Sequence, residues 1–182
     1  MHGELVALVA SVEETRDAVV AAATAVSDEQ AAFRPDGGWS IAEVIEHLYR
    51  AELTGIARMW QASAGVRAGR RWDGALPHRG KRIEQVVEET WKAKETAPPA
   101  ATPGGDGPLR LWVMAFLSLR DLLAGLERQL DGLPLDDVVF PHPLSGPLDA
   151  RQRLEFLRYH MERHISQIQR IKESPDFPDA HV

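Results

Sequence analysis

The chain has 182 residues, which suits one domain with a substantial core, and its formal charge of -6 excludes general binding to nucleic acid or an anionic membrane. It contains no cysteine, so disulfides, thiolate metal sites and a thiol nucleophile of its own are excluded. The N-terminal segment has early acids and no basic region, and no apolar run approaches membrane-spanning length. We expect one cytoplasmic domain, 1–182, that does not bind a membrane.

Four long segments have apolar residues spaced three or four apart, which is typical of helices with one buried face. They predict helices over about residues 3–26, 41–65, 109–130 and 150–172. Ser40 with Glu43, and Asp149 with Gln152, have the spacing of capping boxes and predict where the second and fourth helices begin. No segment has a convincing strand pattern, so the sequence predicts an all-α four-helix bundle.

The connections between these helices are short, long and of intermediate length. Residues 67–107 form the long crossover, with a short helix predicted over 83–94, and residues 136–148 are predicted to be irregular. The long crossover can run the length of the bundle, so the predicted order is up-down-down-up. The first part of the crossover is basic; it either receives an anionic substrate or, as the default interpretation, is a solvated loop.

The fourth predicted helix carries two histidines one turn apart, His160 and His164, beside its apolar face. Both imidazoles should therefore face a seam between helices. Such a pair often arises by chance, and the simplest interpretation is two seam histidines hydrogen-bonded to their neighbours. A metal site requires a third ligand directed to the same place.

His47, at the edge of the apolar face of the second helix, could supply that ligand. It lies about 10 Å from the start of its helix, and His160 and His164 lie about 12–18 Å from the end of theirs. If these helices run antiparallel, all three lie at a similar height. Three neutral imidazoles would leave coordination positions open for water or substrate, as in reactive metal sites.

Two other residues near the pair bear on this hypothesis. Gln167 is placed to orient a ligand or a bound water, although it could equally be an ordinary boundary residue. The zincin motif H-E-x-x-H needs a glutamate directly after the first histidine, but Met161 stands there and Glu162 should face solvent. A zincin-type peptidase is therefore disfavoured.

The segments W-S-I-A-E-V-I-E-H (39–47) and H-M-E-R-H-I-S-Q-I (160–168) together resemble the DinB/YfiT-like superfamily, as do the A-P-P-A-A-T-P-G crossover and the H-P-L-S-G-P-L loop. The resemblance implies an up-down-down-up bundle, frequent homodimers, and a three-histidine centre for a divalent metal, typically zinc or nickel. By matching position, the ligands would be His47, His160 and His164. The other histidines are interpreted as non-ligands because of their loop or terminal positions: His2, His78, His142 and His181.

Characterised relatives in that superfamily include S-transferases that depend on a low-molecular-weight thiol and a mycothiol-dependent maleylpyruvate isomerase. The leading hypothesis is thus a metal-dependent transferase that uses an external thiol of the bacillithiol, mycothiol or glutathione type on a small electrophile. One alternative is a metal-dependent hydrolase. Another is a non-catalytic, stress-linked bundle that binds a metal or a partner.

Overall fold

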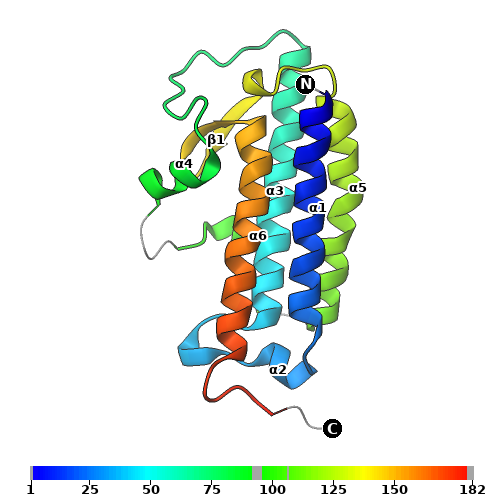
Figure 1. Cartoon of the computed structure of the whole chain (residues 1–182), viewed down its shortest axis with the longest axis vertical. Coiled ribbons are helices and arrows are strands. Elements are labelled where there is room, and N and C mark those ends of the chain that lie inside the picture. Colours follow the sequence, from blue (N-terminus) through cyan, green and yellow to red (C-terminus); the bar gives the residue numbers. More distant parts are fainter. Residues whose placement is uncertain (1, 92–95, 106, 180–182) are drawn as a thin grey trace.

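The structure is a computed structural model that describes residues 2–91, 96–105 and 107–179. Four long helices lie side by side along the longest axis of the molecule (Figure 1). The chain runs in one direction along α1 and α6 and in the opposite direction along α3 and α5 (Figure 1). Helix α1 packs mainly against α6, and α3 packs mainly against α5. The bounds of the four helices are His2–Thr24 for α1, Ile41–Arg67 for α3, Leu109–Leu130 for α5 and Ala150–Lys172 for α6.

The predicted bounds of these helices agree with the structure within about two residues, because the sequence specifies the helix starts. Ser40 caps α3: its hydroxyl accepts from the Glu43 amide, and the Glu43 carboxylate accepts from the Ser40 amide. Asp149 and Gln152 make the same reciprocal pair at the start of α6. Each box satisfies two backbone groups that would otherwise lack partners. Both predicted capping boxes are confirmed.

The prediction of an all-α chain is wrong in one place, a β-hairpin before α6. Strands β1 (Val139–His142) and β2 (Gly146–Asp149) pair antiparallel, with Pro141 opposite Pro147. Proline cannot donate a backbone hydrogen bond, so this pair must occupy a position of the ladder that needs none. The turn is completed by Gly146 at a positive φ of 71°. Strands this short and rich in proline carry almost no alternating pattern, which is why we predicted an irregular stretch.

Shorter elements connect the long helices. The predicted crossover helix 83–94 is α4, which ends at Thr90; residues 92–95 lie outside the described residues. Between α1 and α3, in the connection predicted to be short, there is also a short helix, α2. The bounds of these elements are Asp28–Ala32 for α2 and Ile83–Thr90 for α4, with single 3₁₀ turns at Pro35–Gly37, Pro99–Ala101 and Leu135–Asp137.

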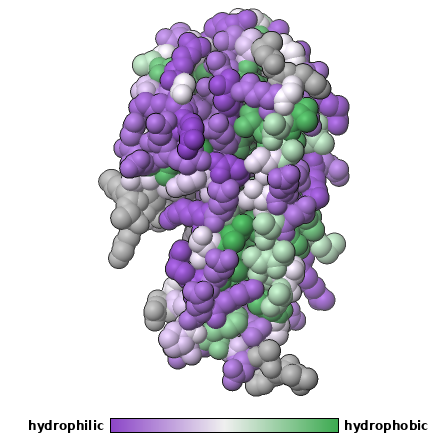
Figure 2. All heavy atoms as spheres, viewed as in Figure 1, coloured by the Kyte–Doolittle hydropathy of each residue, from purple (hydrophilic) through white to green (hydrophobic). Residues whose placement is uncertain are grey.

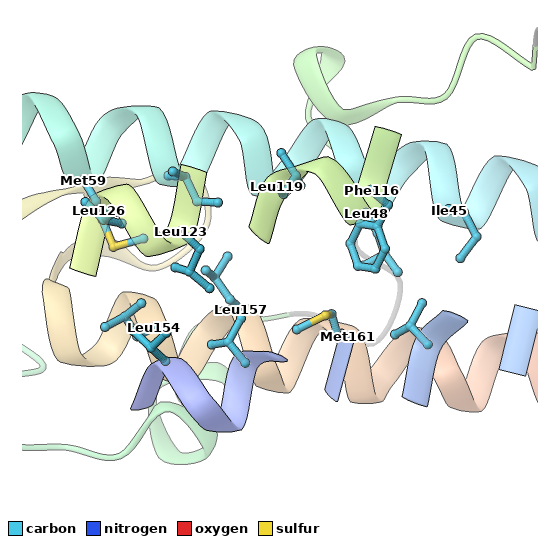
Figure 3. Close-up of a cluster of buried hydrophobic side chains, with 14 of the residues drawn as sticks. Ile45, Leu48, Met59, Phe116, Leu119, Leu123, Leu126, Leu154, Leu157 and Met161 are labelled. Atoms are coloured by element: carbon cyan, nitrogen blue, oxygen red, sulfur yellow. The ribbon is translucent and has the colours of Figure 1, made fainter. Parts of the chain in front are cut away.

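The main hydrophobic core fills the space between the four long helices (Figure 3). Leucines and methionines from α3, α5 and α6 converge there, and each fully buried side chain contributes about 1.5–3 kcal/mol. A second, smaller cluster joins α4 and β2 to α6 and consists of Ile83, Val86, Val87, Leu148 and Phe156. This second cluster positions the crossover beside the histidine-bearing part of α6. No helix in the described ranges is long and apolar enough to span a membrane.

Candidate metal centre

The structure brings His47, His160 and His164 together in the interior, although 113 residues separate the first two in the chain. His47 comes from the second turn of α3, and the other two come from consecutive turns of α6. The Nε2 atom of His160 lies 3.1 Å from Nε2 of His47 and 3.1 Å from Nε2 of His164. All three side chains are buried, with exposed fractions of 4–6%. The predicted convergence of α3 and α6 at this height is therefore present.

The outer two imidazoles are oriented by hydrogen bonds at their other ring nitrogen. Nδ1 of His47 lies 2.8 Å from the carbonyl oxygen of Ala101, and Nδ1 of His164 lies 2.7 Å from Oε1 of Gln167. Both oxygens are acceptors, so each Nδ1 carries the proton and each Nε2 presents a lone pair. The lone pairs of His47 and His164 both point to the region of the His160 Nε2 atom. Gln167 contacts His164, as an orienting residue would.

Aromatic rings hold two of the imidazoles in place. The ring centroids of Trp39 and His47 lie 4.8 Å apart. Phe156 stacks on His160, with 5.3 Å between the ring centroids and 16° between the ring planes. Within the described part of the chain, the buried Nδ1 atom of His160 has no hydrogen-bond partner. The stacking of aromatic rings therefore takes the orienting role at His160 that hydrogen bonds take at His47 and His164.

Burial also keeps the three imidazoles neutral. It lowers the pKa of His164 to about 3, with His47 as a further cause, and lowers the pKa of His160 well below its ordinary value. The pKa of His47 is lowered by burial as well, and the positive charge of Arg163 acts on all three in the same direction. Neutral imidazoles keep the lone pairs that a metal ion requires.

The donor set fits a divalent metal ion. Without an ion, His160 can donate from Nε2 to only one of its two neighbours, which leaves a buried lone pair unsatisfied. An ion would satisfy all three lone pairs together. Because zinc–nitrogen bonds are about 2.0–2.1 Å long, nitrogens on one ion lie about 2.9–3.4 Å apart at bond angles of about 90–110°. The two Nε2 separations from His160, 3.1 Å each, fall in this range, and the donor atoms of all three histidines lie within 4.8 Å of one another.

A cavity of about 950 Å³ opens in front of the three histidines. Its walls come from the segment before α3, the crossover, the hairpin and the C-terminal part of α6. Among its described lining residues are the indoles of Trp39 and Trp91 and the guanidinium groups of Arg163 and Arg170. The three-histidine group is therefore accessible to a small molecule from one side.

The crossover reaches this site because α3 holds it. The carboxylate of Glu46, the residue before His47, is fully buried and accepts from the amides of Gly104 and Gly105 at 2.8 and 3.2 Å. Arg50 also pairs with this carboxylate at 2.7 Å. These bonds fix the segment that brings the Ala101 carbonyl to His47. Glu46 is not predicted as a site residue from the sequence, because a glutamate in a helix ordinarily faces solvent.

His78 and His142 are buried but do not belong to the three-histidine group, and His142 lies in β1 rather than in a loop. His181 and the side chain of His2 lie outside the described part of the chain. Glu162 is exposed and accepts from Arg158 at 2.6 Å, so it does not face the imidazoles. This placement confirms the prediction that Glu162 faces solvent.

Arg163, Arg170 and Trp91 are cavity residues that the sequence analysis did not single out. The two arginines could have been noticed from their spacing: they are seven residues apart on α6, which places them on one side of the helix with the His160 pair. Trp91 could not, because its approach depends on how the crossover folds back. The basic segment that we considered for an anionic substrate, residues 67–82, contributes nothing to the described lining of this cavity.

Comparisons with known proteins agree with the resemblance seen in the sequence. The family model of the DinB superfamily matches residues 11–168, which include all three histidines. The chain is 27% identical over 154 residues to the uncharacterized protein YuaE of Bacillus subtilis (strain 168), a match that covers 81% of this chain and 86% of YuaE. No solved structure matches the chain significantly. The protein belongs to the DinB superfamily.

Proposed function

We propose that His47, His160 and His164 bind a divalent metal ion, with zinc or nickel as the expected metals, and that Gln167 orients His164 toward it. The observation that supports this most directly is the convergence of three Nε2 atoms while both outer Nδ1 atoms are committed to acceptors. In the folded chain these bonds fix which nitrogen the His47 and His164 rings offer, so these two ligands are oriented before an ion arrives.

We further propose that the protein is a transferase that uses an external low-molecular-weight thiol on a small electrophile. A divalent ion would lower the pKa of a bound thiol so that the thiolate forms near neutral pH. The chain has no cysteine, so a thiol nucleophile must come from outside. The cavity beside the histidines is large enough for two small reactants, and its indole walls would exclude water from them.

The alternative of a metal-dependent hydrolase has weaker support in the contacts of the site. Glu43 lies one turn before His47, but its carboxylate is occupied by the Ser40 amide at 2.9 Å and by Arg34 at 2.8 Å. Glu173 is the carboxylate among the described cavity residues, and it is exposed at the cavity edge. A base for a metal-bound water is therefore not evident. A non-catalytic, stress-linked metal-binding bundle is the second alternative.

We propose that the four long helices form an up-down-down-up bundle, which their directions in Figure 1 support.

We propose that the protein is a cytoplasmic homodimer. The dimer is supported by apolar side chains that are exposed on α5, including Leu111, Met114 and Leu122. Figure 2 shows hydrophobic patches on this side of the molecule, over α1 and α5. Analytical ultracentrifugation tests the dimer, and a Met114→Glu variant should sediment as a monomer.

The transferase proposal is tested with the metal-loaded protein, a model electrophile, and bacillithiol, mycothiol and glutathione in turn. We expect consumption of the electrophile with at least one thiol, and loss of that consumption in His47→Ala. Turnover of esters or amides without added thiol, abolished by His47→Ala, would instead favour the hydrolase. A metal-loaded protein that turns over none of these substrates would favour the non-catalytic bundle.

A further inference from the structure

We infer that the cavity holds its organic ligand by a carboxylate, bound by Arg163 and Arg170. This inference rests on the proposed function, because it names the chemical class of one reactant at the same site. Both arginines line the cavity, and Arg163 directly precedes the proposed ligand His164. Seven residues separate the arginines, so their side chains leave α6 on the same side, about 10.5 Å apart along the helix.

Neither guanidinium forms an ion pair within the described part of the chain, unlike other arginines of the same helix. Arg151 contacts the carboxylates of Glu4 and Asp136, and Arg158 contacts those of Glu84 and Glu162. Arg163 instead contacts an indole: its guanidinium carbon lies 5.6 Å from the ring centroid of Trp91. Arg163 and Arg170 are exposed toward the cavity and have their hydrogen-bond donors available.

The charge balance of the cavity favours an anion. Its described lining carries two arginines against one carboxylate, Glu173, and a divalent ion on the histidines would add further positive charge. A guanidinium binds a carboxylate through two parallel hydrogen bonds, a geometry that a lysine cannot reproduce. The indoles of Trp39 and Trp91, which line the cavity, give the carbon skeleton of such a ligand an apolar surface. The cavity therefore suits a small carboxylate with an apolar body.

Either reactant, the thiol or the electrophile, could carry this carboxylate. We would titrate metal-loaded protein calorimetrically with 3-mercaptopropionate and its neutral analogue 3-mercaptopropionamide, and with the thiol-free pair butyrate and butyramide. We expect the acid of at least one pair to bind about ten-fold or more tightly than its amide. If the acid binds more tightly than its amide only in the thiol pair, the carboxylate belongs to the thiol. If the acid binds more tightly in both pairs, either reactant can carry the carboxylate.

The variants Arg163→Gln and Arg170→Gln should each reduce the acid preference, and together they should abolish it. Arg128→Gln is the matched control, because it removes an exposed arginine near the end of α5, which lies at the opposite end of the molecule from the end of α6 (Figure 1). Equal binding of acid and amide by the wild-type protein would overturn the inference. A preference that survives in the double variant would overturn it as well.

A second readout separates this inference from the proposed function. In cobalt-substituted protein, a thiol that reaches the metal should produce a thiolate-to-cobalt absorption band. If the acid preference depends on the two arginines but no band appears, the carboxylate site stands and the thiol transferase proposal fails. If the band appears with both thiols but acid and amide bind equally, the carboxylate inference fails and the proposed function stands.

Discussion

His164 shows how a single side chain is prepared for metal binding by its surroundings. Burial keeps its imidazole neutral, and Oε1 of Gln167 accepts a hydrogen bond from Nδ1–H, so that Nε2 carries the lone pair. The orienting contact is local, because the glutamine lies three residues later on the same helix. The contact that orients His47 is not local: it comes from the crossover, at Ala101.

We predict that Gln167→Ala weakens metal binding about 10–100-fold, because the His164 ring loses the acceptor that fixes its orientation. Competition with a chromogenic chelator measures the affinity. The matched control is Gln169→Ala, an exposed glutamine two residues further along α6, which should bind metal as tightly as the wild-type protein does. Equal affinities in both variants would show that Gln167 is an ordinary boundary residue.

The lowered pKa of His164 predicts how the stability of the metal-free protein depends on pH. Its folded-state pKa is about 3, against an ordinary 6.5. Below pH 6.5 the unfolded chain takes up a proton that the folded chain takes up only near pH 3. The free energy of unfolding should therefore fall as the pH falls through this window, and be fully retained above 6.5.

The titration of His164 alone should change the free energy of unfolding by up to about 1.4 kcal/mol per pH unit. Urea denaturation of chelator-treated wild-type protein and of His164→Gln, between about pH 6.5 and 4.5, measures it. The variant should have a slope shallower by about that amount, because it lacks the titrating imidazole. Parallel pH dependences in the two proteins would contradict this account of His164.

At the scale of elements, the long crossover is part of the site rather than a mere connection. Glu46 pairs with two of its amides, and the second hydrophobic cluster packs α4 against α6. These contacts bring the Ala101 carbonyl to His47 and Trp91 to the cavity. The hairpin completes this arrangement, since Leu148 of β2 packs in the same cluster as α4.

We predict that Glu46→Ala lowers the free energy of unfolding by about 1–3 kcal/mol, because the amides of Gly104 and Gly105 lose their acceptor. It should also weaken metal binding, since the Ala101 carbonyl is no longer held against His47. Chemical denaturation and chelator competition measure the two effects. Glu14→Ala is the control, because Glu14 is exposed on α1 and should change neither quantity. Unchanged metal affinity in Glu46→Ala would separate the crossover from the site.

The sequence was sufficient to predict the long helices because their signals are local. Ser40 and Asp149 identify two helix starts by residue type and spacing alone, and His160 and His164 share a face by helix geometry. The approach of His160 and His164 to His47 is predicted because the two helices that carry these residues are expected to run antiparallel. The Ala101 carbonyl, in contrast, has no side chain to reveal it, and its position depends on how 41 residues of crossover fold. The hairpin was missed because Pro141 and Pro147 remove the alternation that predicts a strand.

At the scale of the whole molecule, a buried ion pair crosses the main core. Arg16 of α1 lies 2.9 Å from the Glu52 carboxylate of α3, and both side chains are fully buried. Arg16 also donates to the Phe116 carbonyl and lies over the Phe116 ring of α5. Burial raises the pKa of Glu52 to about 7, although Arg16 opposes this shift. This polar cluster joins three of the four long helices at one level.

We predict that Arg16→Met costs about 3–5 kcal/mol of stability, because it leaves the Glu52 carboxylate buried without a partner. The double variant Arg16→Met/Glu52→Leu should recover most of that loss, since it replaces both charges with apolar side chains of similar size. Chemical denaturation of the wild type, both single variants and the double variant forms a complete cycle. A double variant no more stable than Arg16→Met would contradict this prediction, because it would show that the loss of stability does not come from an unpaired Glu52 carboxylate.

The central claim is that three histidines from two helices form one metal site. Its most direct test is the metal content of purified, metal-reconstituted protein, measured by mass spectrometry for the wild type, His160→Ala and His78→Ala. His78 is a matched control because it is also buried but lies outside the three-histidine group. We predict stoichiometric metal in the wild type and in His78→Ala, and its loss in His160→Ala. Metal-free wild-type protein, or metal retained in His160→Ala, would contradict the claim and leave the three imidazoles as packing residues.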